Sequence, residues 1–286
     1  MNPRHIISVL VRSIAKEGTD NDVGIDFSST IKQPPRLNRR SAEYLITGLG
    51  KIEGWLCPTT AHIMATLAEL QTRLGIKGDL AEIGVHHGKS FLPLATAVAP
   101  GEKIFAIDVF EDQYKNFDQS GHGDLQTFLN SVHTYAPGTP LEIVQDSSLD
   151  LAAMGWPKSH ANSIRFFSID GSHTHEATLN DLKIAEQTTK DGAIVAVDDI
   201  LSSHWLGVIS GMFDYLKAGG ELLPFAIIPN KMLLSRGQRL KGSWKDFLRA
   251  HYGQFISKHD VRFLDHPIDV VEENSSILKE LEATMS

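Results

Sequence analysis

The sequence predicts an α/β fold: a doubly wound, mostly parallel seven-stranded sheet with an antiparallel C-terminal strand pair and extra N-terminal helices. Short apolar runs alternate with segments of helical periodicity, as they do in parallel sheets joined by right-handed helical crossovers. Most of these runs are almost continuously apolar, which is typical of strands covered on both faces. Acidic residues follow the runs at the carboxyl ends of the strands, where open α/β sheets bind their ligands.

The expected elements follow from the apolar spacing, in chain order. Residues 18–40 are polar and contain glycines and prolines, which indicates an extended arm, whereas apolar residues recur at helical spacing over Thr59–Leu74. The expected strands are Leu80–Gly84, Lys103–Asp108, Leu141–Gln145, Ile164–Asp170, Ala193–Asp198, Leu222–Ile228 and Lys231–Ser235. The expected helices between them are Ser90–Ala99, Gly123–Tyr135, His175–Thr189 and His204–Lys217. The last two strands, joined by Pro229 and Asn230, are expected to form the antiparallel pair.

The composition argues against several classes of function. The formal net charge is −8 at pH 7 and there is no basic tract, which disfavours binding of nucleic acid through its phosphates. Cys57 is the only cysteine, so the chain forms no internal disulfide and suits a reducing cytoplasm. The apolar run Ile6–Val11 is too short to span a bilayer and indicates an amphipathic helix. We therefore expect a cytoplasmic protein that binds neither membranes nor nucleic acid.

The most informative segment is Leu80–Ser90, an expected strand that leads into a glycine turn. Glycine lets the backbone approach a ligand, and a helix expected to open near Gly88 would offer unpaired N–H groups to a carboxylate or phosphate. Asp108, at the end of the next strand, is placed to hold ribose hydroxyls. The spacing of Gly84 and Gly88 fits neither the dinucleotide fingerprint nor the phosphate-binding loop. The segment therefore predicts an adenosine-type cofactor.

The pattern Glu-x-Gly-Val-x-x-Gly-x-Ser over residues 82–90 resembles motif I of class I S-adenosylmethionine (SAM) methyltransferases, particularly the macrocin- and catechol-O-methyltransferase-like groups. The resemblance extends over residues 50–236 and implies SAM as the cofactor. It implies that Ser90 contacts the SAM carboxylate, that Asp108 contacts the ribose, and that Asp146 and Ser147 contact the adenine. The full cofactor-binding set that it implies is Glu82, Gly84, Gly88, Ser90, Asp108, Asp146, Ser147 and Asp170.

Two neighbouring strand ends are expected to bring carboxylates together. Asp170 follows one of these strands, and Asp198 and Asp199 follow the other. Close carboxylates raise one another's pKa unless a cation intervenes, and such oxygen ligands suit Mg²⁺. The pattern resembles the metal-dependent O-methyltransferases, which implies that Asp170, Asp198 and Asp199 hold Mg²⁺. The alternative is that Asp198 or Asp199 packs against SAM or caps the following helix, with no metal bound.

His173 is the expected catalytic base. It lies three residues after Asp170, where catechol O-methyltransferases carry their catalytic lysine. Its ordinary pKa is near neutrality, which suits removal of a proton from an acceptor hydroxyl. His175 and His204 are competing candidates. The polar stretch 110–124 is expected either as a lid over cofactor and acceptor or as an ordinary connector.

Together these features predict a SAM-dependent O-methyltransferase that acts on a hydroxyl of a small molecule with help from a divalent cation. The expected acceptor is a sugar-bearing metabolite, a glycan precursor or a phenolic compound, and the expected assembly is a homodimer or higher homo-oligomer. The expected parts are an N-terminal helix and arm (1–40), a helical cover (41–78), a SAM-binding methyltransferase core (79–240) and a C-terminal helix and tail (241–286). One alternative is an NAD-dependent oxidoreductase, although the chain lacks the G-x-G-x-x-G fingerprint of that class. The other alternative is a non-catalytic SAM-binding protein.

Overall fold

The computed structural model describes residues 27–285 and contains the α/β sheet that the sequence predicts. The strands are β1 Asp79–Ile83, β2 Ile104–Asp108, β3 Leu141–Gln145, β4 Ile164–Ile169, β5 Thr189–Val197, β6 Leu222–Ile228, β7 Lys231–Arg236, β8 Ile256–Phe263 and β9 His266–Val271. The α-helices are α1 Phe27–Lys32, α2 Arg39–Glu43, α3 Pro58–Arg73, α4 Leu92–Ala95, α5 Leu125–Tyr135, α6 Trp156–Ser159, α7 His175–Thr188, α8 Leu206–Lys217, α9 Lys241–Tyr252 and α10 Ile277–Met285. Shorter helical turns are η1 Tyr44–Gly48, η2 Gln113–Lys115, η3 Ser148–Asp150 and η4 Gly253–Phe255.

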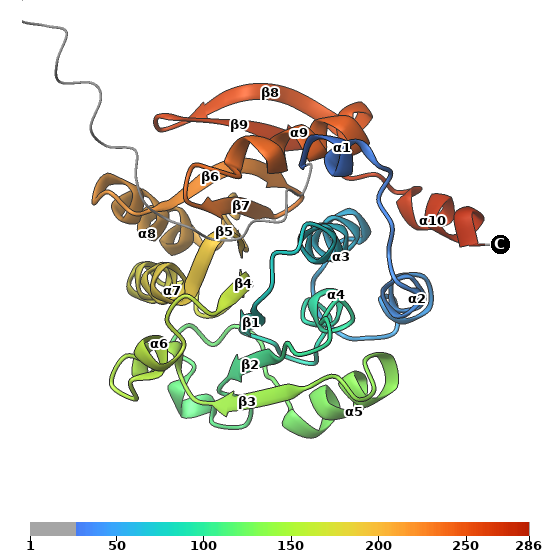
Figure 1. The fold of residues 1–286 in the computed structure, drawn as a ribbon. Coiled ribbons are helices and arrows are strands. Elements are labelled where there is room, and N and C mark those ends of the chain that lie inside the picture. The colour runs from blue at the N-terminus through green and yellow to red at the C-terminus, as the bar shows by residue number, and fades with distance from the viewer. Residues whose placement is uncertain (1–26, 286) are drawn as a thin grey trace, which may run out of the picture.

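The strands form one sheet in the order β3-β2-β1-β4-β5-β7-β6-β9-β8 (Figure 1). Strands β1 to β5 are parallel, and β7 is antiparallel to both β5 and β6. Helices α3, α4 and α5 cover one face, and α6, α7 and α8 cover the other (Figure 1). Each face is buried in its own apolar cluster. The doubly wound class is confirmed, but the expectation of seven strands is wrong, because the sheet has nine within residues 27–285.

The two additional strands lie in the range 241–286, where a helix and tail were expected. This range holds α9, the hairpin β8–β9 and α10, and β9 joins the sheet alongside β6. β8 is a sheet edge whose residues are mostly exposed, so it needs no continuous apolar run and carries Lys258, Asp260 and Arg262 instead. Charged residues on an edge strand also discourage pairing with a second sheet.

Local sequence explains where several helices begin. Pro58 occupies the first turn of α3, where a missing N–H costs little. The side chains of Asp124 and Thr174 cap α5 and α7 by accepting hydrogen bonds from backbone N–H groups of the first turn. The helix expected over 90–99 is shorter in the structure: it is α4, which begins at Leu92. Pro93 lies in its first turn, where a proline is tolerated.

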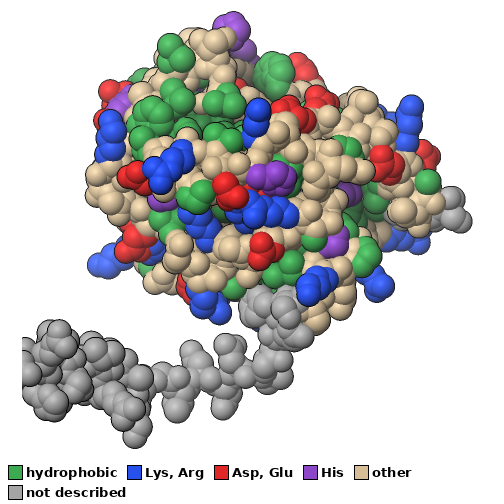
Figure 2. Space-filling view, turned by 90° about the horizontal axis from the view of Figure 1, so that it is seen from above, with side chains coloured by type: hydrophobic (Ala, Val, Ile, Leu, Met, Phe, Trp, Pro, Cys, Tyr) green, Lys and Arg blue, Asp and Glu red, His purple; other side chains and the backbone are tan. Residues whose placement is uncertain are grey.

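The structure describes only part of the N-terminal region in which a helix and an extended arm were expected. The helix expected at Ile6–Val11 lies outside the described residues. Part of the arm expected over 18–40 is helical, as α1. Over residues 27–285, no helix is both long and apolar enough to cross a membrane. On the face above β8 in Figure 1, acidic, basic and histidine side chains are interspersed and form no single basic patch (Figure 2).

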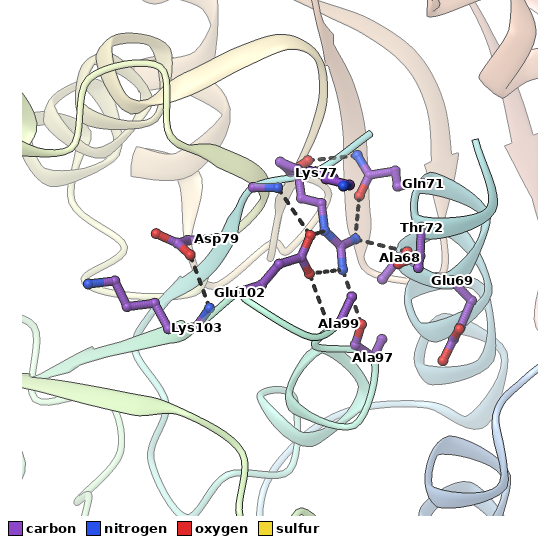
Figure 3. Close-up of polar contacts among 12 residues, drawn as sticks. Ala68, Glu69, Gln71, Thr72, Lys77, Asp79, Ala97, Ala99, Glu102 and Lys103 are labelled. Carbon is purple, nitrogen blue, oxygen red and sulfur yellow. Dashed lines mark hydrogen bonds and ion pairs between the residues drawn. The ribbon is translucent and has the colours of Figure 1, made fainter. Parts of the chain in front are cut away.

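A buried ion pair ties α3 to the sheet at the end opposite the strand ends that carry the acidic residues. The guanidinium of Arg165, in β4, is fully buried and donates to both carboxylate oxygens of Glu102, at 2.9 and 2.8 Å. It also donates to the carbonyl oxygens of Ala68 and Ala97 and to the Gln71 side chain (Figure 3). Every guanidinium nitrogen therefore has an acceptor, which a charge needs when it is removed from water.

We expect Glu102→Gln to lower the free energy of unfolding by about 3–5 kcal/mol, because it leaves the Arg165 charge buried without its counter-ion. Urea denaturation measures this loss. Arg239→Gln is the matched control, since Arg239 and Asp191 are both 56% exposed and such a pair contributes about 1 kcal/mol or less. Equal losses in the two variants would contradict the role given to the buried pair.

Candidate active site

A cavity of about 560 Å³ opens at the carboxyl ends of β1 to β5. It lies where β1 pairs with β2 on one side and β4 on the other, which is the switch point at which doubly wound sheets bind ligands. Its volume is within the range of small-molecule and cofactor sites. The predicted site residues that line it are Gly84, Ser90, Asp108, Asp146, Ser147, Asp170, His173, Asp198 and Asp199.

The turn after β1 forms one wall of the cavity and depends on Gly84. This glycine has φ +80°, and a Cβ there would lie 1.9 Å from the carbonyl oxygen of Asp170. Only glycine allows β1 and β4 to end so close together. The next residues are held by Asp108, whose carboxylate accepts hydrogen bonds from the N–H groups of His86 (2.8 Å) and Phe110 (2.7 Å). Burial raises the pKa of Asp108.

Two predicted cofactor residues do not line the cavity. Glu82 is fully buried beneath it, and one of its oxygens accepts a hydrogen bond from Ser168 at 2.8 Å. Burial raises the pKa of Glu82 to about 7, against the opposing effects of Lys231 and Ser168. Gly88 lies behind the turn, where its Cα faces Phe128. The helix expected at Gly88 starts only at Leu92, so the cavity wall here is a turn and not a helix N-terminus.

The polar stretch 110–124 forms the cavity wall opposite the sheet. Eight of its residues line the cavity: Gln113, Lys115, Asn116, Phe117, Gln119, Ser120, Gly121 and Gly123. Lys115 forms an ion pair with Asp146 at the end of β3. Asp118 accepts hydrogen bonds from the backbone N–H and the imidazole of His173, after β4. The stretch is therefore fixed to two strand ends across the cavity mouth.

The His173 imidazole is held between two carboxylates. Nδ1 lies 2.9 Å from Asp118 Oδ2, and Nε2 lies 3.0 Å from Asp199 Oδ2. Its ring stacks on Trp205, with centroids 4.2 Å apart and planes at 18°. Helix α8 can approach because a Cβ on Gly207 would lie 2.2 Å from the His173 carbonyl oxygen. A ring fixed on three sides is oriented for proton transfer.

The charges around His173 favour its protonated form. Burial alone would lower the pKa of His173, but the hydrogen bonds to Asp118 and Asp199 raise it to about 9. Burial alone would raise the pKa of Asp118, yet the bonds from His173 and Ser120 hold it well below its usual range. The Trp205 face stabilises the imidazolium further. His173 is therefore a cation at neutral pH while both carboxylates face it.

The three carboxylates predicted as metal ligands lie together, and side chains of the β6–β7 hairpin reach all three of them. Lys231 Nζ lies 3.1 Å from Asp170 Oδ2 and 3.0 Å from Asp198 Oδ2. Asn230 Nδ2 donates to Asp198 Oδ1 at 2.9 Å and to Asp199 Oδ1 at 3.1 Å. Asp199 and Asn230 adopt positive φ angles, 55° and 67°, which are costly for residues other than glycine and are often found at functional sites.

The competing histidines lie elsewhere. His175 pairs with Ser210 and Asp214 on α8, and His204 is exposed in the turn before α8. Neither lines the cavity. The α8 N-cap is Trp205, whose side chain makes no capping bond, so Asp199 does not cap this helix.

Residues 81–200 match the family model described as a methyltransferase domain. This part of the chain is therefore a methyltransferase domain. The matched range runs from β1 to the aspartate pair after β5, and it includes every predicted site residue. The match is to methyltransferases and gives no support to the NAD-dependent oxidoreductase alternative.

One solved structure resembles most of this chain in fold, and others match it more weakly. The O-methyltransferase NovP has a TM-score of 0.54 and 13% identity, and the match covers 74% of this chain and 98% of NovP. An O-methyltransferase from Bacillus cereus in complex with SAH has a TM-score of 0.49 and 13% identity, covering 69% of this chain and 91% of that one. TomG from Streptomyces achromogenes, in complex with SAM, has a TM-score of 0.48 and 15% identity, covering 71% and 92%. No curated protein matches. At these identities the likeness to NovP establishes the fold alone.

Four contributors to the site of the methyltransferase domain were not predicted: Asp118, Asn230, Lys231 and Trp205. Asp118 lies in the stretch expected as a lid, but nothing in its spacing indicates which strand end it meets. The Pro229-Asn230 turn was predicted, and the register pairing Val197 with Met232 places Lys231 next to Asp198. A lysine at the start of an otherwise apolar strand was the available signal.

We expect Gly84→Ala to abolish or strongly weaken binding of S-adenosylhomocysteine (SAH) to the methyltransferase domain, because the new Cβ would collide with the Asp170 carbonyl. Isothermal titration calorimetry measures the affinity, and thermal unfolding reports the fold. Gly138→Ala is the control: its φ is also positive, at 73°, but nothing lies within 4 Å of its Cβ. It should cost about 1 kcal/mol in stability and leave SAH binding unchanged. Normal SAH binding by Gly84→Ala would contradict this account of the turn.

Proposed function

We propose that the chain transfers the methyl group of SAM to a hydroxyl oxygen of a small acceptor, with His173 as the base. The observation that carries the proposal is the His173 imidazole, fixed by Asp118 at the mouth of a cavity in a SAM-dependent methyltransferase domain. An imidazole backed by a carboxylate is suited to accept a proton, because the carboxylate stabilises the imidazolium that forms.

The lining residues divide into two groups that suit the two substrates. Ser90, Asp108 and the Asp146-Ser147 pair lie at the ends of β1 to β3, as SAM requires by the stated resemblance. Asp170 and His173 lie beyond the switch point, at the end of β4. This arrangement supports a cofactor held on one side and an acceptor presented on the other, which positions two reactants for a displacement.

The chemistry needs one proton to be removed. SAM supplies a methyl group on a sulfonium sulfur. The acceptor oxygen forms a bond to the methyl carbon, the carbon–sulfur bond breaks, and its electron pair stays on sulfur. The hydroxyl proton passes to Nε2 of the neutral form of His173, after the acceptor hydroxyl has taken the place of Asp199 at that nitrogen. Asp118 keeps the ring in place and stabilises the resulting cation.

The residues expected to hold Mg²⁺ do not fit that ion in this arrangement. Both oxygens of Asp198 and both oxygens of Asp199 already have partners within the protein, and Lys231 takes one oxygen of Asp170. Mg²⁺ demands a regular octahedron of oxygens at about 2.0–2.1 Å. We therefore derive no step through a metal.

Aromatic side chains at the cavity support a small organic acceptor. Trp55 and Phe117 both line it while remaining 74% and 65% exposed. Exposed aromatic surface of this kind stacks on phenolic rings and on the apolar faces of sugars. The acidic chain, with net charge −8, gives no support to a nucleic acid as acceptor. A homodimer stays a prediction.

We expect His173→Asn to reduce methyl transfer by about 10²- to 10⁴-fold while the SAH affinity stays within about threefold. Asp118→Asn should reduce transfer less, by about tenfold or more, because it misplaces the base without removing it. Transfer is measured with methyl-labelled SAM against a panel of phenolic and sugar hydroxyl compounds, and SAH binding by calorimetry. His204→Asn, an exposed histidine outside the cavity, is the control.

The outcomes separate the alternatives. Absence of SAH binding to the wild type would overturn the proposal at its first step. SAH binding with no transfer to any acceptor in the panel would favour a non-catalytic SAM-binding protein. Full activity of His173→Asn would rule out His173 as the base.

We expect the rate of transfer to rise with pH through about 9. The pKa of His173 is raised to about 9 by Asp118 and Asp199, so the neutral form that accepts a proton gains population as pH increases. Asp118→Asn removes one of the two groups that raise this pKa, so its profile should shift to lower pH. Rate–pH profiles at saturating SAM measure both. An unshifted profile in Asp118→Asn would show that another group sets the pH dependence.

A further inference from the structure

Lys231 lies in an unusual position for a lysine. Its side chain is 1% exposed and its Nζ lies between the carboxylates of Asp170 and Asp198. An ammonium at this distance from two carboxylates keeps its charge, because each carboxylate is a hydrogen-bond acceptor of opposite charge.

The other oxygen of Asp198 and both oxygens of Asp199 are also occupied. Asn230, next to Lys231 in the hairpin turn, donates to Asp198 and Asp199. The turn itself is anchored from the other side of the sheet, because Thr60 of α3 donates to the Pro229 carbonyl oxygen at 2.6 Å. The β6–β7 hairpin therefore holds the ammonium of Lys231 and the amide of Asn230 against the carboxylates.

We infer that Lys231 is the built-in cation of this site and takes the place of a divalent metal. An ammonium 3.0–3.1 Å from both carboxylates already supplies the positive charge that burial demands. A divalent ion bound to the same oxygens would lie against this ammonium and be repelled by it. The inference rests on the proposed function, because it concerns how the site of a methyltransferase is held together. It assigns Lys231 as a positioning residue that keeps Asp170 and Asp198 in place without touching the substrates.

The rival arrangement is a metal held by Asp170, His173 and Asp199, whose ligand atoms lie within 4.8 Å of one another. In that arrangement the ion would lie beside a charged lysine, because Lys231 already contacts Asp170. The charge of Lys231 favours the internal cation.

The test compares wild type with Lys231→Ala and Lys231→Met, using Mn²⁺ as the probe. Electron paramagnetic resonance of free Mn²⁺ measures metal binding, thermal unfolding measures stability, and calorimetry measures SAH affinity with EDTA or with excess Mg²⁺. Lys245→Met is the matched control, since Lys245 also reaches two carboxylates, Asp260 at 2.6 Å and Asp269 at 3.5 Å, but lies outside the cavity.

For the wild type we expect no stoichiometric Mn²⁺ binding and an SAH affinity that is the same in EDTA and in Mg²⁺. Lys231→Ala opens space beside unpaired carboxylates, so it should bind Mn²⁺ at least about tenfold more tightly than wild type. Its lowered unfolding midpoint should recover on adding Mn²⁺. Lys231→Met, which fills the space without charge, should lose stability with less recovery. Lys245→Met should acquire no Mn²⁺ site in the cavity and keep the wild-type SAH affinity.

One Mn²⁺ bound per wild-type chain, or a loss of SAH affinity on adding EDTA, would overturn the inference. These wild-type measurements decide it even where Lys231→Ala does not fold. Absence of SAH binding in both EDTA and Mg²⁺ would instead contradict the proposed function. The Mn²⁺ measurements would still decide the role of Lys231.

Discussion

The burial of carboxylates at the ends of β4 and β5 is the constraint on which the site depends. Asp170 and Asp198 are largely withdrawn from water, and an isolated carboxylate in that position would be costly. The compensating groups come from a distant part of the chain, the β6–β7 hairpin: Lys231 at the start of β7 and Asn230 in the turn before it. These groups meet only when β7 inserts antiparallel between β5 and β6, so formation of the charged cluster and closure of the sheet are one event.

Buried charged groups are compensated in different ways at the two ends of the sheet. At the amino end of β4, Arg165 and Glu102 satisfy each other, and backbone carbonyls and the Gln71 side chain take the remaining donors. At the carboxyl end, Glu82 keeps one buried oxygen without a hydrogen-bond partner, and the carboxylates line an open cavity. The first arrangement is complete in itself and stabilises the fold. The second lines an open cavity, which is what a cofactor site needs.

Sequence reasoning succeeded where burial leaves a strong pattern. Strands such as β4 and β6 are apolar because both faces are covered, and the acidic residues after them could be placed on one rim by topology alone. It failed for β8, whose exposed residues need no apolar pattern, and it could not assign Lys231 or Asp118. The side on which Lys231 emerges depends on strand register, and the partner of Asp118 depends on the path of a loop. Local periodicity of the sequence predicts neither the strand register nor the path of the loop.

The fixed loop links access to the cavity with the state of the base. Residues of the stretch 110–124 form a cavity wall, and two contacts hold the stretch there: Lys115 with Asp146, and Asp118 with His173. The first pair is partly exposed, at 22% for each side chain, and is therefore weakened by salt, whereas the second is more buried, at 9% and 11%. A movement that opened the wall would take Asp118 away from His173 and remove one of the two groups that raise its pKa. Closure of the wall and orientation of the His173 ring are in this way the same structural change. Closure also raises the pKa of His173, so the oriented ring must lose a proton before it can act as a base.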